Sequence, residues 1–336
     1  MIQTVIQQLV DGEDLTRDTA RGVMEQIMSG DATDAQIGAF LVALRCKGET
    51  VQEVVGFTEV MREKVTQISG GKGTKIDTCG TGGDGSGTFN ISTAVAFVAA
   101  GAGLCVAKHG NRAMSSKCGS ADVLQELGVN IEIDPEKVAE CLEEANIGFL
   151  YAPMLHGAMK HAIGARREIG MRTVFNILGP LTNPAGAKRQ LLGVFHHSLT
   201  EKIASVLLAM GSERAYVVHG SDGLDEVSST GSSQVTELKS GRLKTFEISP
   251  NQFGFDIASP ADLKGGTVSD NARILTAVLE GKRGPAKDVV VMNSALALAV
   301  GDLVDDLHSG VNLAEEIIDS GRALTALEKL REVSNS

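Results

Sequence analysis

The stretch DTCGTGGDGSGTFNIST, residues 77–93, decides the fold, because it joins a predicted strand to a predicted helix through a run of glycines. The strand is KIDTC, which ends at Cys79, and the apolar helix begins at Ser92. Several glycines before a helix N-terminus let backbone N–H groups converge on a phosphate, whose charge the helix dipole also favours. The stretch therefore predicts a site for a phosphorylated ligand, and the alternative is a turn that only needs positive φ.

The glycine spacing alone does not identify the ligand. The pattern G-x-G-x-x-G, which begins at Gly80, formally matches a dinucleotide fingerprint. That fingerprint needs an acidic residue about 20 positions later, at the end of the second strand, whereas LCVAKHG presents Lys108 and His109 there. No Gly-Lys-Ser/Thr follows, so a P-loop is excluded. Asp84 inside the loop fits a ligand that also presents hydroxyls or a metal.

Short β-type segments alternate with helices beyond this stretch. LCVAKHG and IGFLYAP are predicted strands, separated by a helix from Ser120, and QLLGVF and RAYVVHG are separated by a helix over Thr200–Met210. TELKSGRLKTFEI predicts a hairpin that turns at Ser240-Gly241, and apolar helices such as ALALAVGDLVDDL follow. Strand–helix–strand units at this spacing indicate an α/β fold with a mainly parallel central sheet.

The N-terminal part reads differently. TARGVMEQIM and AQIGAFLVALR have apolar residues at helical spacing, and Thr50 with Glu53 forms a capping box before VVGFTEVM. GGKGTK, residues 70–75, is a candidate glycine hinge. A helix over 155–168 and a loop over 176–186 are expected to pack back onto the N-terminal helices. The predicted division is a helical domain over 1–70, joined by 155–186, and an α/β domain over 71–154 and 187–336.

Composition excludes several classes of protein. The chain has 336 residues and a net charge of −11, which disfavours a general nucleic-acid surface and requires a local basic patch for any anion. Its longest apolar run, Ala94–Ala107, falls short of the roughly 20 residues that span a bilayer. The cysteines are scattered without metal-ligand spacing, which favours reduced thiols and a cytoplasmic location: Cys46, Cys79, Cys105, Cys118 and Cys141.

Two further motifs follow predicted strands. KHGNRAMSSKCGSAD, residues 108–122, supplies the cations Lys108, Arg112 and Lys117 beside several neutral donors, and its alternative is a solvated basic loop. In GSDGLDEVSSTG, residues 220–231, the adjacent carboxylates of Asp225 and Glu226 suit Mg²⁺ carried by substrate phosphates, and the alternative is an acidic surface turn. Parallel strands usually neighbour each other in the sheet, so the glycine stretch and the basic loop are expected to share one edge.

Together with RREIGMRTVFNILGPLTNP, residues 166–184, these motifs closely resemble the anthranilate phosphoribosyltransferases over nearly the whole chain. The resemblance implies a small helical domain and a larger α/β domain, with the active site in the cleft between them. It also implies a homodimer formed through the helical domains, and an Mg²⁺-dependent transfer from phosphoribosyl pyrophosphate to anthranilate. Two alternatives are a pyrimidine nucleoside phosphorylase and a non-catalytic, nucleic-acid-binding relative of the same fold.

The resemblance also implies roles for individual residues. Lys108, Asp225 and Glu226 are the expected catalytic residues, and Ser92, Asp225 and Glu226 the expected metal ligands. The expected phosphoribosyl pyrophosphate contacts are Gly80, Gly83, Asp84, Thr88, Asn90, Ile91, Ser92, Thr93, Lys108, His109, Gly110, Asn111, Arg112, Ala113, Met114, Ser115, Ser116 and Ser120. The expected anthranilate contacts are Gly80, Asn111, His156 and Arg166.

The expected anthranilate contacts include one residue, Arg166, whose role also has a chemical reason independent of the resemblance. Near them the sequence also departs from the usual family pattern. A planar guanidinium such as that of Arg166 can pair with a benzoate carboxylate through two parallel hydrogen bonds. His156 has the alternative of a satisfied packing histidine. Gly157 follows it where the family usually has proline, and Ile163, Gly164 and Ala165 also depart from the usual run before the arginine pair. These departures concern the shape of the acceptor channel.

Overall fold

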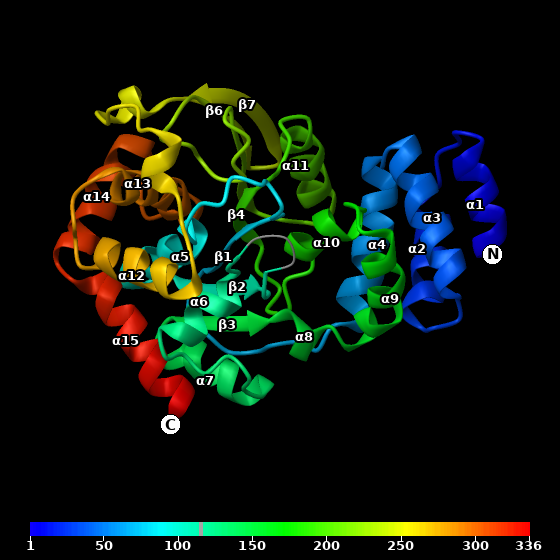
Figure 1. Ribbon diagram of the computed structural model, residues 1–336, viewed down its shortest axis with the longest axis horizontal. Coiled ribbons are helices and arrows are strands. Elements are labelled where there is room, and N and C mark those ends of the chain that lie inside the picture. Colours follow the sequence, from blue (N-terminus) through cyan, green and yellow to red (C-terminus); the bar gives the residue numbers. More distant parts are fainter. Residues whose placement is uncertain (114–116) are drawn as a thin grey trace.

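The computed structural model describes residues 1–113 and 117–336 (Figure 1). Four N-terminal helices lie together at one end of the molecule: α1 (Ile2–Val10), α2 (Arg17–Met28), α3 (Asp34–Lys47) and α4 (Val51–Lys64). The predicted capping box of α4 is confirmed, since Glu53 N–H donates to Thr50 Oγ1 over 3.3 Å and Thr50 N–H donates to Glu53 Oε2 over 2.7 Å. The Glu53 carboxylate is fully buried, and Lys47 Nζ lies 3.0 Å from it.

One seven-stranded sheet, in the order β3-β2-β1-β4-β5-β6-β7, forms the centre of the larger part. β1 to β5 pair in parallel, whereas β5, β6 and β7 pair antiparallel. The predicted α/β class with a mainly parallel sheet is confirmed, as is the hairpin turn at Ser240-Gly241, where both residues have positive φ. The strands are β1 (Lys75–Gly80), β2 (Cys105–Gly110), β3 (Ile147–Tyr151), β4 (Arg189–Gly193), β5 (Arg214–Gly220), β6 (Ser233–Lys239) and β7 (Arg242–Ile248).

Helix α5 (Ile91–Gly101) connects β1 to β2 and packs against both, and its apolar residues Ala94–Ala99 are fully buried. It also packs against α13 (Pro285–Val300) and α15 (Arg322–Asn335), so one core joins the sheet to the C-terminal helices. The other helices of this part are α6 (Ser120–Glu126), α7 (Pro135–Glu144), α11 (Leu199–Ala209), α12 (Val268–Leu279) and α14 (Leu307–Asp319), with short 3₁₀ turns at Pro250–Phe253 and Pro260–Leu263.

The segment 155–186 lies beside the N-terminal helices (Figure 1). Its helix α9 (Lys160–Ile169) packs against α2 and α3, and α10 (Phe175–Leu181) packs against α4. Ala162, Phe175 and Leu178 share one hydrophobic cluster with the apolar residues of α2 to α4. Parts of the segment 155–186 therefore pack against the N-terminal helices.

Three local predictions were wrong. The helix expected over 155–168 is interrupted after α8 (Ala152–Leu155), where His156 has non-helical dihedrals and a 3₁₀ turn, Gly157–Met159, precedes α9. The loop expected over 176–186 contains α10, whose apolar residues are buried although Pro180 stands in its last turn. The helix expected through ALALAVGDLVDDL ends at Val300, because Asp302 adopts φ 58° and Asp306 caps α14 through Ser309 N–H at 2.9 Å.

Within the described part of the chain, no helix combines the length and the apolar character needed to cross a membrane.

Candidate active site

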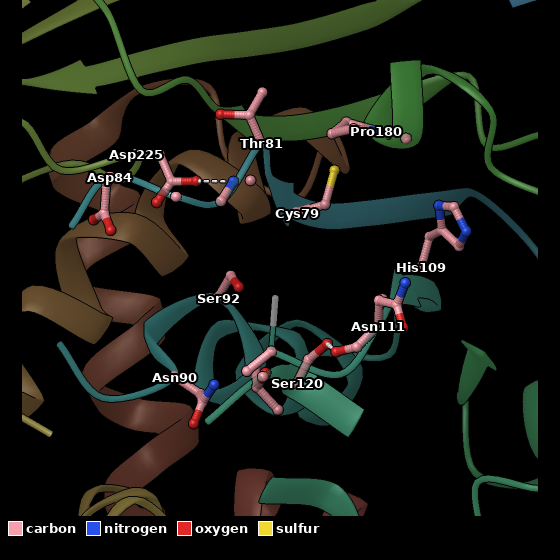
Figure 2. A pocket seen from close by; sticks show the side chains of 18 of the residues that line it. Cys79, Thr81, Asp84, Asn90, Ser92, His109, Asn111, Ser120, Pro180 and Asp225 are labelled. Atoms are coloured by element: carbon pink, nitrogen blue, oxygen red, sulfur yellow. Dashed lines mark hydrogen bonds between the residues drawn. The ribbon is translucent and has the colours of Figure 1, made fainter. Parts of the chain in front are cut away.

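A cavity of about 350 Å³ lies at the carboxyl ends of β1 and β2, between the sheet and α10. Figure 2 shows Asp84 and Asp225 together on one side of it, with His109 and Asn111 on the other. Most of the predicted site residues line this cavity: Gly80, Gly83, Asp84, Thr88, Asn90, Ser92, Thr93, Lys108, His109, Gly110, Asn111, Arg112, Ala113, Ser120, Arg166, Asp225 and Glu226. The fold therefore brings four separate segments of the sequence to one place.

Some predicted residues do not line it. Ile91 is fully buried in the core, and His156 reaches the cavity only through His109. Met114, Ser115 and Ser116 lie outside the described residues. The cavity also has a wall that the sequence reasoning missed, made by the segment 175–180 of α10, which carries Asn176 and Pro180.

The first half of the glycine loop is fixed by hydrogen bonds. Thr81 N–H donates to the Gly193 carbonyl over 2.9 Å, and Phe195 N–H donates to Thr81 Oγ1 over 3.1 Å. Gly82 N–H donates to Asp225 Oδ2 over 2.7 Å, the dashed contact in Figure 2. A Cβ at Gly193 would overlap the Asp225 carbonyl, so only glycine permits this approach of the acidic turn to β4.

Three carboxylates form a cluster at this end of the cavity, since oxygens of Asp84, Asp225 and Glu226 all lie within 4.8 Å of one another. Burial raises the pKa of Asp225 to about 6, and the neighbouring Asp84 adds to the effect. Burial and the Asp225 charge raise the pKa of Glu226 well above its usual range. Three carboxylates this close repel one another when ionised, and a hard divalent cation held by oxygen ligands would offset that repulsion. Asp84 is a third carboxylate in the cluster, in addition to the predicted ligands Ser92, Asp225 and Glu226.

Lys108 is almost completely buried between this cluster and the sheet. Its Nζ donates to the Thr78 carbonyl over 2.6 Å and to Ser92 Oγ over 3.4 Å, at the start of α5. Burial lowers the pKa of Lys108, and the charge of Asp77 opposes that shift. The ammonium group is therefore directed to the point where the glycine loop enters the helix.

Asp77 and Asn183 form a buried pair that the sequence reasoning missed. Asp77 accepts from His109 N–H over 3.2 Å and from Asn183 Nδ2 over 2.8 Å. Asn183 Nδ2 also donates to the Ala107 carbonyl over 2.8 Å. The segment that follows α10 is thereby tied to both β1 and β2, which fixes the cavity wall to the sheet.

Arg112 is engaged by protein groups in this structure. Its guanidinium donates to the Tyr151 hydroxyl over 3.0 Å and to Asp122 over 3.1 Å. Asp122 also accepts from Ala113 N–H over 3.0 Å and Gly119 N–H over 2.8 Å, so one carboxylate joins the two ends of this loop. The role of Arg112 as a direct ligand contact stays a prediction.

Arg166, on α9, also lines the cavity and stacks on Phe175, with its guanidinium carbon 5.0 Å from the ring centroid. Within the described part of the chain its side chain has no hydrogen bond or ion pair. Arg166 is half-buried, and this burial lowers the pKa of its guanidinium group. A partly buried cation without a protein counter-ion is suited to an anionic ligand.

His109 and His156 lie against each other, with their Nε2 atoms 3.1 Å apart. Burial lowers the pKa of His109 to about 3 and that of His156 to about 4. At neutral pH both rings are uncharged, and one Nε2–H donates to the other Nε2. His109 therefore gives the cavity wall an uncharged ring near α10, with His156 behind it.

The low pKa values of this histidine pair predict that the free energy of unfolding falls as the pH drops below about 6.5. The folded-state pKa values of about 3 and 4 lie below the ordinary 6.5, so the unfolded chain binds more protons between about pH 6.5 and 4. Each histidine lowers the free energy of unfolding by up to about 1.4 kcal/mol per pH unit in that window. Urea unfolding of the wild type and of His156→Gln at a series of pH values measures this slope, which should be shallower in the variant. Imidazole NMR that shows either ring protonated near pH 6 would contradict the prediction.

Comparisons with known proteins agree with this geometry. Residues 3–65 match the glycosyl transferase family helical bundle domain, and residues 72–324 match the glycosyl transferase family a/b domain. The anthranilate phosphoribosyltransferase of Acetivibrio thermocellus is 53% identical over 336 residues, which cover 100% of this chain and 97% of that protein.

Solved structures give the same result. The crystal structure of anthranilate phosphoribosyltransferase from Thermus thermophilus has a TM-score of 0.93 and 39% identity, covering 99% of both chains. The enzyme from Saccharomyces cerevisiae in complex with phosphoribosyl pyrophosphate and Mg has a TM-score of 0.90 and 29% identity, covering 99% of this chain and 98% of that one. These matches support neither the nucleoside phosphorylase nor the nucleic-acid-binding alternative. The chain belongs to the anthranilate phosphoribosyltransferases, the enzymes of tryptophan biosynthesis that transfer the phosphoribosyl group of phosphoribosyl pyrophosphate to the amine of anthranilate.

Proposed function

We propose that the cavity is the active site for this transfer, and that its two ends bind the two substrates. The observation that carries the proposal is one cavity lined both by a carboxylate cluster and by Arg166, a cation with no ion pair among the described residues. Phosphoribosyl pyrophosphate lies along the glycine loop and the start of α5, and anthranilate lies between Arg166 and α10. The yeast relative was solved in complex with phosphoribosyl pyrophosphate and Mg, which supports this compound as the donor substrate.

Mg²⁺ is proposed to bind at Asp84, Asp225 and Glu226, with Ser92 as the further ligand implied by the resemblance. When bound, the ion neutralises negative charge on the pyrophosphate oxygens. The carboxylates hold it at the end of the cavity, and Lys108 Nζ, already directed toward Ser92, adds a fixed positive charge beside the leaving group. The backbone N–H groups at the start of α5 stabilise the phosphates.

The chemistry needs little proton transfer by the protein. The amine of anthranilate is an aryl amine, which is unprotonated at neutral pH and can attack C1 of the ribose directly. The bond from C1 to the pyrophosphate oxygen breaks as the C1–N bond forms, and the amine loses its proton afterwards. The contribution of the chain is to position the two substrates and to stabilise the departing charge. The uncharged His109–His156 pair keeps the wall of the acceptor end free of competing charge.

The division into two domains and the homodimer are part of the same proposal. The helical domain consists of 1–70 with 155–186, and the remainder forms the α/β domain. Val42 on α3, Ile163 on α9 and Met171 after it are exposed apolar residues on the helical part, and α3 packs against α9. Exposed apolar side chains on neighbouring helices support an interface there. A biosynthetic reaction on small molecules supports the predicted cytoplasmic location.

The proposal is tested by mixing the purified protein with anthranilate, phosphoribosyl pyrophosphate and Mg²⁺ and following the loss of anthranilate fluorescence. Loss of signal is expected only when all three are present. Omission of each component in turn is the control, and chelation of Mg²⁺ before mixing should stop the reaction. Phosphate-dependent cleavage of thymidine by the same preparation, without consumption of anthranilate, would overturn the proposal.

A further inference from the structure

An arginine outside the cavity contacts the glycine loop, and no role is predicted for this arginine from the sequence. Arg172 lies in the connection between α9 and α10. A Cβ at Gly83 would lie 3.3 Å from Arg172 Nε and 3.8 Å from its Cζ, so the guanidinium lies directly against this glycine. Arg172 does not line the cavity, whereas Gly83 and the next residue, Asp84, both do.

Arg172 is held in place by an aromatic ring. Its Cζ lies 4.5 Å from the ring centroid of Phe195, a close cation–π contact. Within the described part of the chain its side chain forms no hydrogen bond or ion pair. The contacts that define its position are therefore the ring on one side and the glycine loop on the other.

Phe195 also forms a hydrogen bond that fixes the glycine loop. Its backbone N–H donates to Thr81 Oγ1 over 3.1 Å, two residues before Gly83. Gly82, between them, donates its N–H to Asp225 over 2.7 Å. Thr81 and Gly82 are thus fixed by hydrogen bonds, and Gly83 is contacted by Arg172, which stacks on Phe195. Beyond Gly83 the loop continues into Asp84, whose carboxylate belongs to the acidic cluster.

We propose that Arg172 is a positioning residue, which fixes the glycine loop at Gly83 and thereby holds the Asp84 carboxylate in the metal-binding cluster. The inference rests on the proposed function, because it assumes that Asp84 binds Mg²⁺. It adds a link between the two parts of the site, since the connection that carries Arg172 follows directly on the helix of the acceptor residue Arg166. The donor loop is thus held by the segment that also carries an acceptor contact.

The test compares Arg172→Ala with the matched control Arg167→Ala, an exposed arginine on α9. We expect Arg172→Ala, which removes an exposed cation–π contact, to raise the KM for phosphoribosyl pyrophosphate and the half-saturating Mg²⁺ concentration about fivefold. The KM for anthranilate and the thermal midpoint should stay within about twofold and about two degrees of the wild type. Arg167→Ala should leave all four quantities unchanged.

A second variant separates the stack from the charge. Phe195→Leu keeps the backbone N–H that binds Thr81 but removes the ring, and it should raise the Mg²⁺ requirement in the same direction. The double variant Arg172→Ala with Phe195→Leu should need no more Mg²⁺ than Arg172→Ala alone, because the two side chains act together. Arg172→Lys should recover only part of the loss, since an ammonium group lacks the planar face.

The variant Asp84→Asn distinguishes the proposed metal role of Asp84 from the positioning role of Arg172. If Asp84→Asn raises the Mg²⁺ requirement and Arg172→Ala does not, the positioning role is wrong while the proposed metal site stands. If Asp84→Asn leaves the Mg²⁺ requirement unchanged, the metal role of Asp84 and the inference built on it both fail. Equal increases in both KM values for Arg172→Ala, with a lowered thermal midpoint, would also overturn the positioning role.

Discussion

Turnover is expected to be lost, with the fold intact, when Asp225→Asn and Glu226→Gln are combined. The two amides keep the size of the carboxyl groups, and an amide oxygen at position 225 can still accept the Gly82 N–H bond that now measures 2.7 Å. What disappears is the charge that we propose holds Mg²⁺ against the pyrophosphate. Loss of the main charge stabilisation of a leaving group should lower kcat by about a thousandfold or more. The anthranilate fluorescence assay measures this directly.

The same variant should be no less stable than the wild type without metal. The folded-state pKa of Asp225 is about 6, above its usual 3.8, so its contribution to stability is present below pH 3.8 and is lost as the pH rises through about 6. At neutral pH the buried charges are therefore a cost, which the amides remove. The matched control is Asp305→Asn with Glu328→Gln, which makes the same charge change at exposed positions. A double variant of the site that turns over like this control would refute the metal assignment.

The parts of the site that could be predicted from the sequence are those with a local signal. The glycine run between strand and helix, the lysine near the end of β2, and the adjacent carboxylates after β5 all occur at element boundaries. Parallel pairing then brings the ends of these strands to one edge of the sheet. The fold class followed from the same alternation, because strand and helix periods are local properties of the sequence.

Contacts between distant segments could not be predicted in this way. Asp77 and Asn183 are separated by 106 positions, and only the packed fold shows that one satisfies the other. Neither does the sequence show that Asp84 would reach the carboxylates of the acidic turn, which are more than a hundred residues away. These pairs depend on which strands are neighbours and on the exact path of the loops.

Helix α10 was missed for a related reason. Its sequence FNILGPL is followed by TNP, and Gly, Pro and Asn are the usual signals of a loop. Burial of Phe175, Leu178 and Leu181 in the cluster shared with the N-terminal helices overrides this local preference. The missed helix matters for function, because it lines the cavity on the side where we propose that anthranilate binds.

At that acceptor side, Arg166→Ala is expected to raise the KM for anthranilate about 50-fold and the KM for phosphoribosyl pyrophosphate by less than about threefold. Arg166 has no protein counter-ion in the described part of the chain, so removing it leaves no buried partner unsatisfied and should cost little stability. The loss falls on the substrate carboxylate, which would have to enter the cavity without its pair of charge-assisted hydrogen bonds.

Steady-state kinetics with each substrate varied in turn measures both constants, and Arg167→Ala, the neighbour that faces solvent, serves as the control. The stacking of Arg166 on Phe175, with 5.0 Å between the guanidinium carbon and the ring centroid, adds a finer expectation. Arg166→Lys keeps the charge but loses the fork and the stack, so its KM for anthranilate should lie between those of the alanine variant and the wild type. Equal effects of Arg166→Ala on both substrates would place the arginine outside the acceptor end, because a residue that only shapes the cavity has no reason to distinguish the two ligands.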